Sequence, residues 1–199
     1  MAAPATTGKL PLNMHVIVAE PAAVQDRNMK RSSAQDPLPS RPDMPGYGLP
    51  EGPEGLIPWS WADRRLQDSH NYWLATVRHD GRPHLMVIWG LWLEGMFYFS
   101  TGSRSRKTRN LENNSHCVIG TEQSHEAVVV EGVAEKLLDV EQLKALLSIY
   151  ERKYDYDMST MRQDILELRE PIFAVRPNVA FGLDEEAGME NATRWRFAP

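Results

Sequence analysis

The chain has 199 residues, of which 42% are hydrophobic and 25% are charged, proportions that are ordinary for a globular protein with one domain. Its net charge of −5 argues against a general binder of nucleic acid or of anionic membranes, since both need a positive field. The single cysteine, Cys117, excludes an intrachain disulfide and paired-cysteine zinc sites, and no apolar run is long enough to span a bilayer, so we expect a cytoplasmic protein.

Residues 1–45 differ in composition from the rest of the chain. Seven prolines interrupt them and no hydrophobic period is sustained, so they lack the apolar surface that orders a segment. We therefore expect a disordered N-terminal arm over residues 1–45 and a single folded domain over residues 46–199. After a Gly/Pro-rich lead-in, we expect a short helix over residues 61–69 with Ser60 as its N-cap.

Residues 72–101 are typical of short strands joined by tight turns. Asp80-Gly81 and Glu94-Gly95 are turn signals between runs that are rich in β-forming residues. Strands are expected over residues 72–78, 83–93 and 96–101. We expect each of them to pair with its neighbour in a meander.

The second half of the chain mixes strands with helices. Apolar residues from Val140 to Tyr154 recur at helical spacing behind Asp139, which predicts an amphipathic helix capped by that aspartate. Further helices are expected over residues 103–113 and 160–169, and strands over residues 116–122, 127–136, 172–183 and 193–197. Arg176-Pro177 indicates a kink or an edge in its strand. Six or seven short antiparallel strands with two or three helices predict a closed or partly closed barrel.

A basic cluster begins where the strand over residues 96–101 is expected to end. Four of the six residues from Arg104 to Arg109 are basic, although the chain as a whole is acidic. Free N–H groups at a helix start attract anions. An arginine can donate two parallel hydrogen bonds to a phosphate, and the Ser105 hydroxyl can donate a further hydrogen bond. A solvated basic face would have the same composition, and cations oppose the dipole at a helix N-terminus. From the residues alone, a phosphate site and an ordinary surface both stay open.

Several motifs occur in an order and spacing that is similar to a known family. They are Tyr-Trp-Leu-Ala-Thr-Val-Arg-His-Asp-Gly-Arg-Pro-His at 72–84, Trp-Gly-Leu-Trp at 89–92, Ser-Arg-Lys at 105–107 with Asn110, and residues 128–132. Together they resemble the pyridoxamine 5′-phosphate oxidase-like flavin and deazaflavin oxidoreductases over about residues 46–199. The resemblance implies a split β-barrel, mainly β with flanking helices. It also implies a homodimer that binds FMN or coenzyme F420 at its interface, and haem in some branches.

The resemblance also implies which residues of this chain contact the cofactor. Ser105, Arg106 and Lys107 match the phosphate-binding triplet of the family. The strand end before the triplet is matched by Tyr98, Ser100 and Thr101. The strand beside the isoalloxazine ring is matched by Met86, Val87, Ile88 and Trp89. The aromatic residue near the C-terminus is matched by Trp195, beside Arg194. Arg104 and Arg109 could serve the longer anionic tail of coenzyme F420, which favours F420 over FMN.

The C-terminal segment departs from the pattern of the vitamin B6 oxidases. Those enzymes carry Arg-x-His there, whereas this chain reads Arg194-Trp195-Arg196, so the whole pattern looks closer to the F420-using branch. We expect an oxidoreductase that transfers a hydride between coenzyme F420, or FMN, and a small organic substrate. Its proton donor stays unassigned among Tyr72, Tyr98, His84 and water.

Two alternatives remain from the sequence. The first is a non-catalytic carrier of flavin or haem on the same barrel, and the second is a dimeric interaction protein that has lost the cofactor. No metal site is expected, because His84, His116 and His125 lack a ligand-like partner at close spacing and are typical of structural histidines.

Overall fold

The computed structural model describes residues 36–198, which hold nine strands, four α-helices and one short 3-10 helix. The strands are β1 (Leu38–Ser40), β2 (Tyr72–Val77), β3 (Pro83–Ile88), β4 (Leu91–Leu93), β5 (Met96–Ser100), β6 (His116–Thr121), β7 (Glu126–Lys136), β8 (Ile172–Asp184) and β9 (Thr193–Arg196). The helices are α1 (Trp59–Asp68), α2 (Arg106–Asn113), α3 (Val140–Tyr154), α4 (Ser159–Leu166) and the 3-10 helix η1 (Met189–Asn191).

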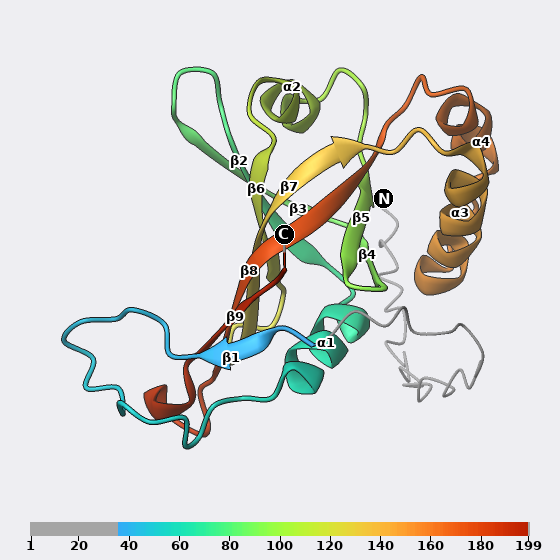
Figure 1. Cartoon of the computed structure of the whole chain (residues 1–199). Coiled ribbons are helices and arrows are strands. Elements are labelled where there is room, and N and C mark those ends of the chain that lie inside the picture. The colour runs from blue at the N-terminus through green and yellow to red at the C-terminus, as the bar shows by residue number, and fades with distance from the viewer. Residues whose placement is uncertain (1–35, 199) are drawn as a thin grey trace, which may run out of the picture. The chain divides into compact units, whose positions relative to one another are not determined.

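The strands form one antiparallel sheet that curls into an open barrel (Figure 1). Its order is β1-β9-β8-β7-β6-β2-β3, and β8 also pairs with β5, which in turn pairs with β4. No ladder joins β3 to β4, so the sheet does not close. This confirms the prediction of a mainly β, split-barrel fold with flanking helices, although the described residues hold more strands than the six or seven expected.

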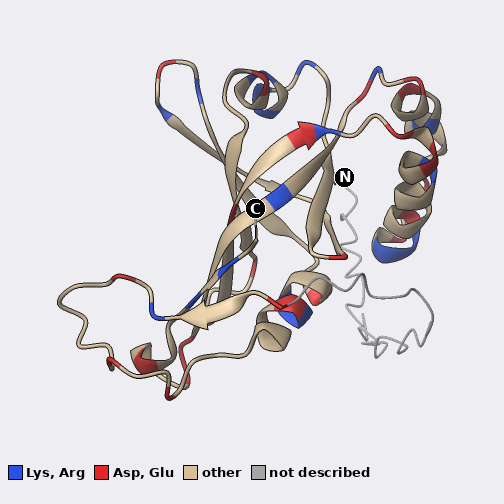
Figure 2. Ribbon diagram, in the orientation of Figure 1, with Lys and Arg blue, Asp and Glu red and all other residues tan. Residues whose placement is uncertain are grey.

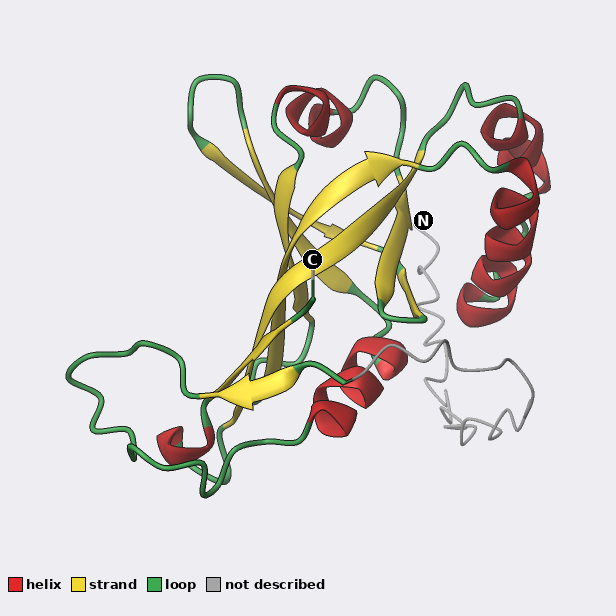
Figure 3. Cartoon of the chain, in the orientation of Figure 1, coloured by secondary structure: helices red, strands yellow, loops and turns green. Residues whose placement is uncertain are grey.

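Two hydrophobic clusters hold the barrel together. The first fills the inner face of the sheet and includes Tyr72, Leu74, Phe97, Ile119, Val130 and Trp195, each of them at most 1% exposed. The second lies between the sheet and the helices α3 and α4, which cover one side of it (Figure 3). Leu143, Leu147 and Tyr150 belong to the second cluster, so the predicted apolar stripe of α3 is confirmed as a packing surface.

The expected strand over residues 83–93 is wrong, because the chain bends at Trp89 and Gly90 and divides it into β3 and β4. A Cβ atom at Gly90 would lie 2.1 Å from Phe97 Cζ, so only glycine fits at this bend. The Tyr154 hydroxyl accepts a hydrogen bond from the Gly90 N–H at 2.7 Å and holds the bend against α3. The meander is therefore incomplete, since β3 pairs with β2 only, and β2 pairs on its other side with β6.

The N-terminal segment also differs from expectation. Residues 1–35 of the predicted disordered arm lie outside the described residues, but Leu38–Ser40 forms β1 and pairs with β9. The backbone of β9 offers an edge to which even a proline-containing segment can bind. Ser60 is not the N-cap of α1, because the helix already begins at Trp59, after Pro58.

A bulge confirms the irregularity expected at Arg176-Pro177. In the ladder between β7 and β8, Glu131 faces Val179 whereas Gly132 faces Pro177, which leaves Asn178 as an extra residue. A Cβ atom at Gly132 would lie 2.5 Å from the carbonyl oxygen of Arg176, so the close approach of the two strands requires glycine. Over the described residues, no helix is both long and apolar enough to cross a membrane.

Candidate functional site

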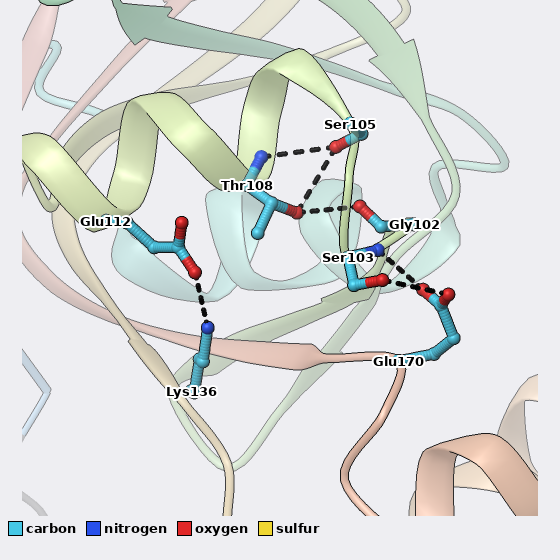
Figure 4. Close-up of polar contacts among 7 residues, drawn as sticks. All are labelled: Gly102, Ser103, Ser105, Thr108, Glu112, Lys136 and Glu170. Atoms are coloured by element: carbon cyan, nitrogen blue, oxygen red, sulfur yellow. Dashed lines mark hydrogen bonds and ion pairs between the residues drawn. The ribbon is translucent and has the colours of Figure 1, made fainter.

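The loop between β5 and α2 is ordered by hydroxyl groups (Figure 4). Ser105 caps α2, because its Oγ accepts a hydrogen bond from the Thr108 N–H at 3.1 Å. The Thr108 hydroxyl donates to the Gly102 carbonyl at 2.8 Å, and Thr101 Oγ1 lies 3.0 Å from Ser105 Oγ. The first role of Ser105 is therefore to cap the helix. Its hydroxyl can still donate one hydrogen bond, either to a neighbouring hydroxyl or to an anion.

Glu170 fixes the same loop from the segment that leads into β8. Its carboxylate accepts hydrogen bonds from the Ser103 N–H at 2.6 Å and from the Ser103 hydroxyl at 3.0 Å (Figure 4). The carboxylate thus binds the loop before the helix and leaves the first turn free. Within residues 36–198, no hydrogen bond uses the N–H groups of Arg106 and Lys107. Two donors at the positive end of the helix dipole are therefore available to an anion.

Cations from two separate segments meet beside this helix start. Partial burial lowers the pKa of His84, and the nearby charges of Arg78, Lys107 and Arg106 lower it further. His84 lies on β3 and Arg78 directly after β2, whereas the other two belong to the first turn of α2. Figure 2 shows Lys and Arg in blue on both the β2–β3 hairpin and α2. None of the three cations forms an ion pair within residues 36–198. Arg78 Nε is also buried without a hydrogen-bond partner among these residues, which costs free energy.

A buried polar pair attaches α2 to the sheet beside these cations. The Asn110 side chain donates to Thr76 Oγ1 at 2.9 Å, and Thr76 Oγ1 lies 3.5 Å from His84 Nδ1. Both Asn110 and Thr76 are only 2% exposed. Because Thr76 faces His84 in the ladder between β2 and β3, this contact fixes the hairpin relative to the helix start.

Residues 62–177, more than half of the chain, match the family model described as pyridoxamine 5′-phosphate oxidase. The chain belongs to this family. No curated protein sequence matches the chain.

Solved structures share the fold of this pyridoxamine 5′-phosphate oxidase family member at low identity. A hypothetical protein from Mycobacterium tuberculosis is 21% identical, covers 66% of this chain and 88% of its own length, and has a TM-score of 0.58. General Stress Protein 26 from Bacillus anthracis is 19% identical over 63% of this chain and 92% of its own, with a TM-score of 0.51. A haem-binding protein from Mycobacterium smegmatis is 15% identical over 71% of this chain and 59% of its own, with a TM-score of 0.54.

The structure brings together only part of the site that the family resemblance implied. Thr101, Ser105, Arg106 and Lys107 lie around the start of α2, and exposed Arg104 lies on the loop before it. Sequence reasoning missed Arg78 and Thr76, and considered His84 as a possible proton donor and as a structural histidine. The signal was present, because residues that flank a predicted hairpin turn face each other across it.

The four residues of β3 and its end point in different directions. Met86 and Ile88 lie on the inner face, where Met86 is 47% exposed and Ile88 is buried, while Val87 faces Trp73 on the outer face. Trp89 lies past the end of the strand and stacks on Tyr154, with ring centroids 4.4 Å apart. One flat ring can therefore lie along the backbone of β3 but cannot contact all four side chains.

Three other predicted residues do not join the helix start. Tyr98 is buried against α3, where its hydroxyl accepts a hydrogen bond from Gln142 at 3.2 Å, because alternation along β5 turns it away from the inner face. The Ser100 hydroxyl is buried without a partner among the described residues. Trp195 is fully buried and packs edge-to-face against Trp59 at 5.4 Å.

Two of the three side chains considered as proton donors are buried phenols. Burial raises the pKa of Tyr72, whose hydroxyl donates to the Leu66 carbonyl at 2.5 Å. Burial also raises the pKa of Tyr98. Neither phenol is placed to give up a proton near neutral pH.

Proposed function

We propose that this chain binds coenzyme F420, or FMN, with its phosphate at the start of α2, and that it is an oxidoreductase acting on a small organic substrate. The observation that carries the proposal is the start of α2, where the N–H groups of Arg106 and Lys107 form no hydrogen bond within residues 36–198. The contacts from Asn110 to Thr76 and from Thr76 to His84 place the β2–β3 hairpin beside this helix. When bound, the ring of such a cofactor supplies the hydride chemistry, and the protein supplies binding and orientation.

The donor set fits a phosphate group. The N–H groups and the side chains of Arg106 and Lys107 would bind its oxygens, while the Ser105 cap holds the helix start in place. Exposed Arg104 and Arg109 lie before and after this turn and form no ion pair within residues 36–198. They suit further negative charges along the tail of F420, which supports F420 over FMN.

A homodimer is part of the proposal. On the outer face of β2 and β3, Trp73 is 44% exposed, Val87 45% and Leu85 56%. Trp73 faces Val87 directly in the ladder, so their side chains form one continuous apolar surface at an edge of the sheet. Monomeric proteins rarely leave such a surface in water, and we infer that a second copy of this chain covers it.

A non-catalytic carrier of flavin or haem is the second candidate. It is favoured by the burial of Tyr72 and Tyr98, two of the side chains considered as proton donors. A haem-binding protein from Mycobacterium smegmatis has a similar structure, which supports a carrier role for the barrel of this chain.

One titration separates these candidates. The purified protein is titrated with F420, FMN and haem while absorbance is recorded, and reduced cofactor is then mixed with an enone or a quinone. Binding of F420 with consumption of its reduced form is expected. Tight binding without turnover would favour the carrier, and no binding of F420 or FMN would refute the cofactor assignment.

The phosphate site has its own test. Arg106→Ala combined with Lys107→Ala removes two charged contacts, so we expect cofactor affinity to fall about 100-fold or more while the fold is kept. Arg82→Ala is the matched control, because Arg82 is exposed on the β2–β3 hairpin and pairs with Asp80. Unchanged affinity in the double variant would show that the phosphate binds elsewhere.

A further inference from the structure

Glu170 is an acidic side chain that lies beside the proposed phosphate site and binds its loop. The Glu170 carboxylate accepts hydrogen bonds from the Ser103 N–H at 2.6 Å and from the Ser103 hydroxyl at 3.0 Å (Figure 4). A Cβ atom at Gly102 would lie 3.8 Å from Glu170 Oε2, so the carboxylate also lies along the backbone at Gly102. One side chain from the segment before β8 thus contacts two consecutive residues of the loop between β5 and α2.

These two residues belong to the turn that begins α2. The Gly102 carbonyl accepts hydrogen bonds from the Ser105 N–H at 2.9 Å and from the Thr108 hydroxyl at 2.8 Å. The Thr108 N–H in turn donates to the oxygen of the Ser105 cap. Contacts therefore lead without a gap from Glu170 through Ser103 and its neighbour to the helix start. A shift of Ser103 would change the direction in which the free N–H groups of the first turn point.

The negative charge of Glu170 has no cation to balance it. Within residues 36–198, no ion pair includes Glu170. The adjacent Arg169 pairs with Asp164 and Glu167 instead. A carboxylate without a cation beside an anion site opposes the binding of that anion, because like charges repel. Local conflicts of this kind are expected where a sequence serves function.

Glu170 lies close enough to the proposed phosphate for this repulsion to be felt. The Arg106 N–H is three residues after the Ser103 N–H, and three residues of extended chain span at most about 11 Å. That distance is close to the Debye length of about 8–10 Å at ordinary ionic strength, and Glu170 is half-buried, which reduces screening by salt. The repulsion grows with the charge of the ligand. A phosphate monoester carries nearly two negative charges at neutral pH, whereas a phosphodiester carries one.

We propose that Glu170 is a positioning residue that also sets the charge preference of the phosphate site. This inference rests on the proposed function. The hydrogen bonds to Ser103 hold the loop so that the helix N–H groups point toward the phosphate, while the charge of the carboxylate disfavours a monoester more than a diester. FMN presents a phosphate monoester, whereas a phosphodiester joins the ring part of F420 to its tail. Glu170 therefore favours F420 over FMN.

Two substitutions separate the two roles. Glu170→Gln removes the charge but keeps both contacts, because its amide oxygen accepts from the Ser103 N–H and its NH₂ group donates to the Ser103 hydroxyl. Glu170→Ala removes the charge and both contacts, so the difference between the two variants measures the positioning role alone. Glu167→Gln is the matched control, because Glu167 is exposed three residues earlier and pairs with Arg169.

Methyl phosphate and dimethyl phosphate serve as probes, because at pH 8 they carry about two negative charges and about one. Each is titrated into the ¹⁵N-labelled full chain at a constant ionic strength of about 50 mM, where the Debye length exceeds 10 Å, and amide shifts at residues 103–108 are followed by NMR. Glu170→Gln should raise the affinity for methyl phosphate about threefold more than that for dimethyl phosphate, and about 1 M salt should abolish this difference. Glu170→Ala should bind both probes about tenfold more weakly than Glu170→Gln, because the loop loses its two hydrogen bonds. Glu167→Gln should bind both as the wild type does.

Three results would overturn the inference. An equal change for both probes in Glu170→Gln would refute the charge preference, and equal affinities of Glu170→Gln and Glu170→Ala would refute the positioning role. A wild type without saturable shifts at residues 103–108 up to about 10 mM of either probe would refute both.

Titration of the wild type and Glu170→Gln with FMN and F420 keeps this inference apart from the proposed function. The affinity for FMN should rise about threefold more than that for F420. Binding of F420 with an unchanged ratio of the two affinities would refute the role of Glu170 and leave the proposed function. A wild type that binds methyl phosphate at the helix start but neither cofactor would refute the proposed function and leave Glu170 as the positioning residue of an anion site.

Discussion

Ser105 has two roles that a pair of substitutions can separate. Its oxygen caps α2 through the Thr108 N–H at 3.1 Å, and its hydroxyl lies beside the proposed phosphate. Ser105→Ala loses the cap and should lower the free energy of unfolding by about 1 kcal/mol. Ser105→Asp keeps a capping oxygen but adds a negative charge, which should abolish cofactor binding while stability is retained.

Urea unfolding and cofactor titration of both variants check this prediction. Cofactor affinity that survives in Ser105→Asp would place the anion away from the helix start. A stability in Ser105→Ala equal to that of the wild type would mean that water replaces the cap.

Lys153 is a half-buried cation near the bend at Gly90. Its amine donates to the Tyr72 hydroxyl at 2.9 Å and to the Gly90 carbonyl at 3.1 Å. Burial lowers the pKa of this amine from its ordinary 10.5 to about 8, although the charges of Asp68 and Glu122 oppose the shift. Between pH 8 and pH 10.5, the unfolded chain therefore binds more protons at this site than the folded chain.

Because the unfolded chain binds more protons at Lys153, the stability of the folded chain increases with pH over this range. The free energy of unfolding should rise from pH 8 toward pH 10 in the wild type, and Lys153→Met should remove that part of the rise. Urea unfolding across this range measures it, with Lys144→Met as a control at an exposed lysine of the same helix. Parallel pH profiles for the wild type and Lys153→Met would contradict the lowered pKa.

At the scale of elements, Arg41 ties the segment before α1 to the C-terminal end of the chain. Its guanidinium donates to the carbonyls of Gly52 and Ala192, each at 3.3 Å, and also to those of Glu54 and Glu190. One side chain thus orders the lead-in beside β1 and the turn around η1. Such nonlocal carbonyl contacts explain how a proline-rich segment becomes ordered without a hydrophobic stripe of its own.

Removal of this guanidinium should loosen the lead-in selectively. For Arg41→Ala we expect faster hydrogen exchange over residues 38–57 and a loss of about 1–3 kcal/mol in stability, with little change in β6 and β7. Hydrogen–deuterium exchange with mass spectrometry measures both regions. Arg169→Ala serves as the control, because Arg169 pairs with Asp164 on a different surface. Unchanged exchange over residues 38–57 would show that strand pairing alone holds β1.

At the scale of the whole molecule, the outer face of β2 and β3 should decide the oligomeric state. Leu85→Asp places a charge within the apolar surface of Trp73, Leu85 and Val87, so we expect the proposed dimer to dissociate. Analytical ultracentrifugation of the variant and the wild type measures the mass. Leu138→Asp is the control, because Leu138 is also exposed, at 66%, but lies between β7 and α3. A dimer that persists in Leu85→Asp would exclude this face, and a monomeric wild type would refute the homodimer.

The sequence by itself determined the features that depend on neighbours along the chain. The Asp80-Gly81 turn, the apolar stripe of α3 behind Asp139, and the basic helix start after Gly102 all follow from local backbone preference and helical spacing. The order of the family-like motifs along the chain predicted the split barrel, and the structure confirms this fold. The same local rules could not say that Tyr98 faces α3, because strand alternation gives two faces without naming the inner one.

Only the tertiary structure decided which distant segments meet. It divided the expected strand over residues 83–93 at Gly90, where Phe97 leaves no room for a side chain, and it paired β1 with β9. It also placed the β2–β3 hairpin, which carries Arg78 and His84, beside the basic start of α2 through the contact between Asn110 and Thr76. Pairing across a sheet depends on loop closure and on packing over the entire barrel, and neither is encoded within a local window of sequence.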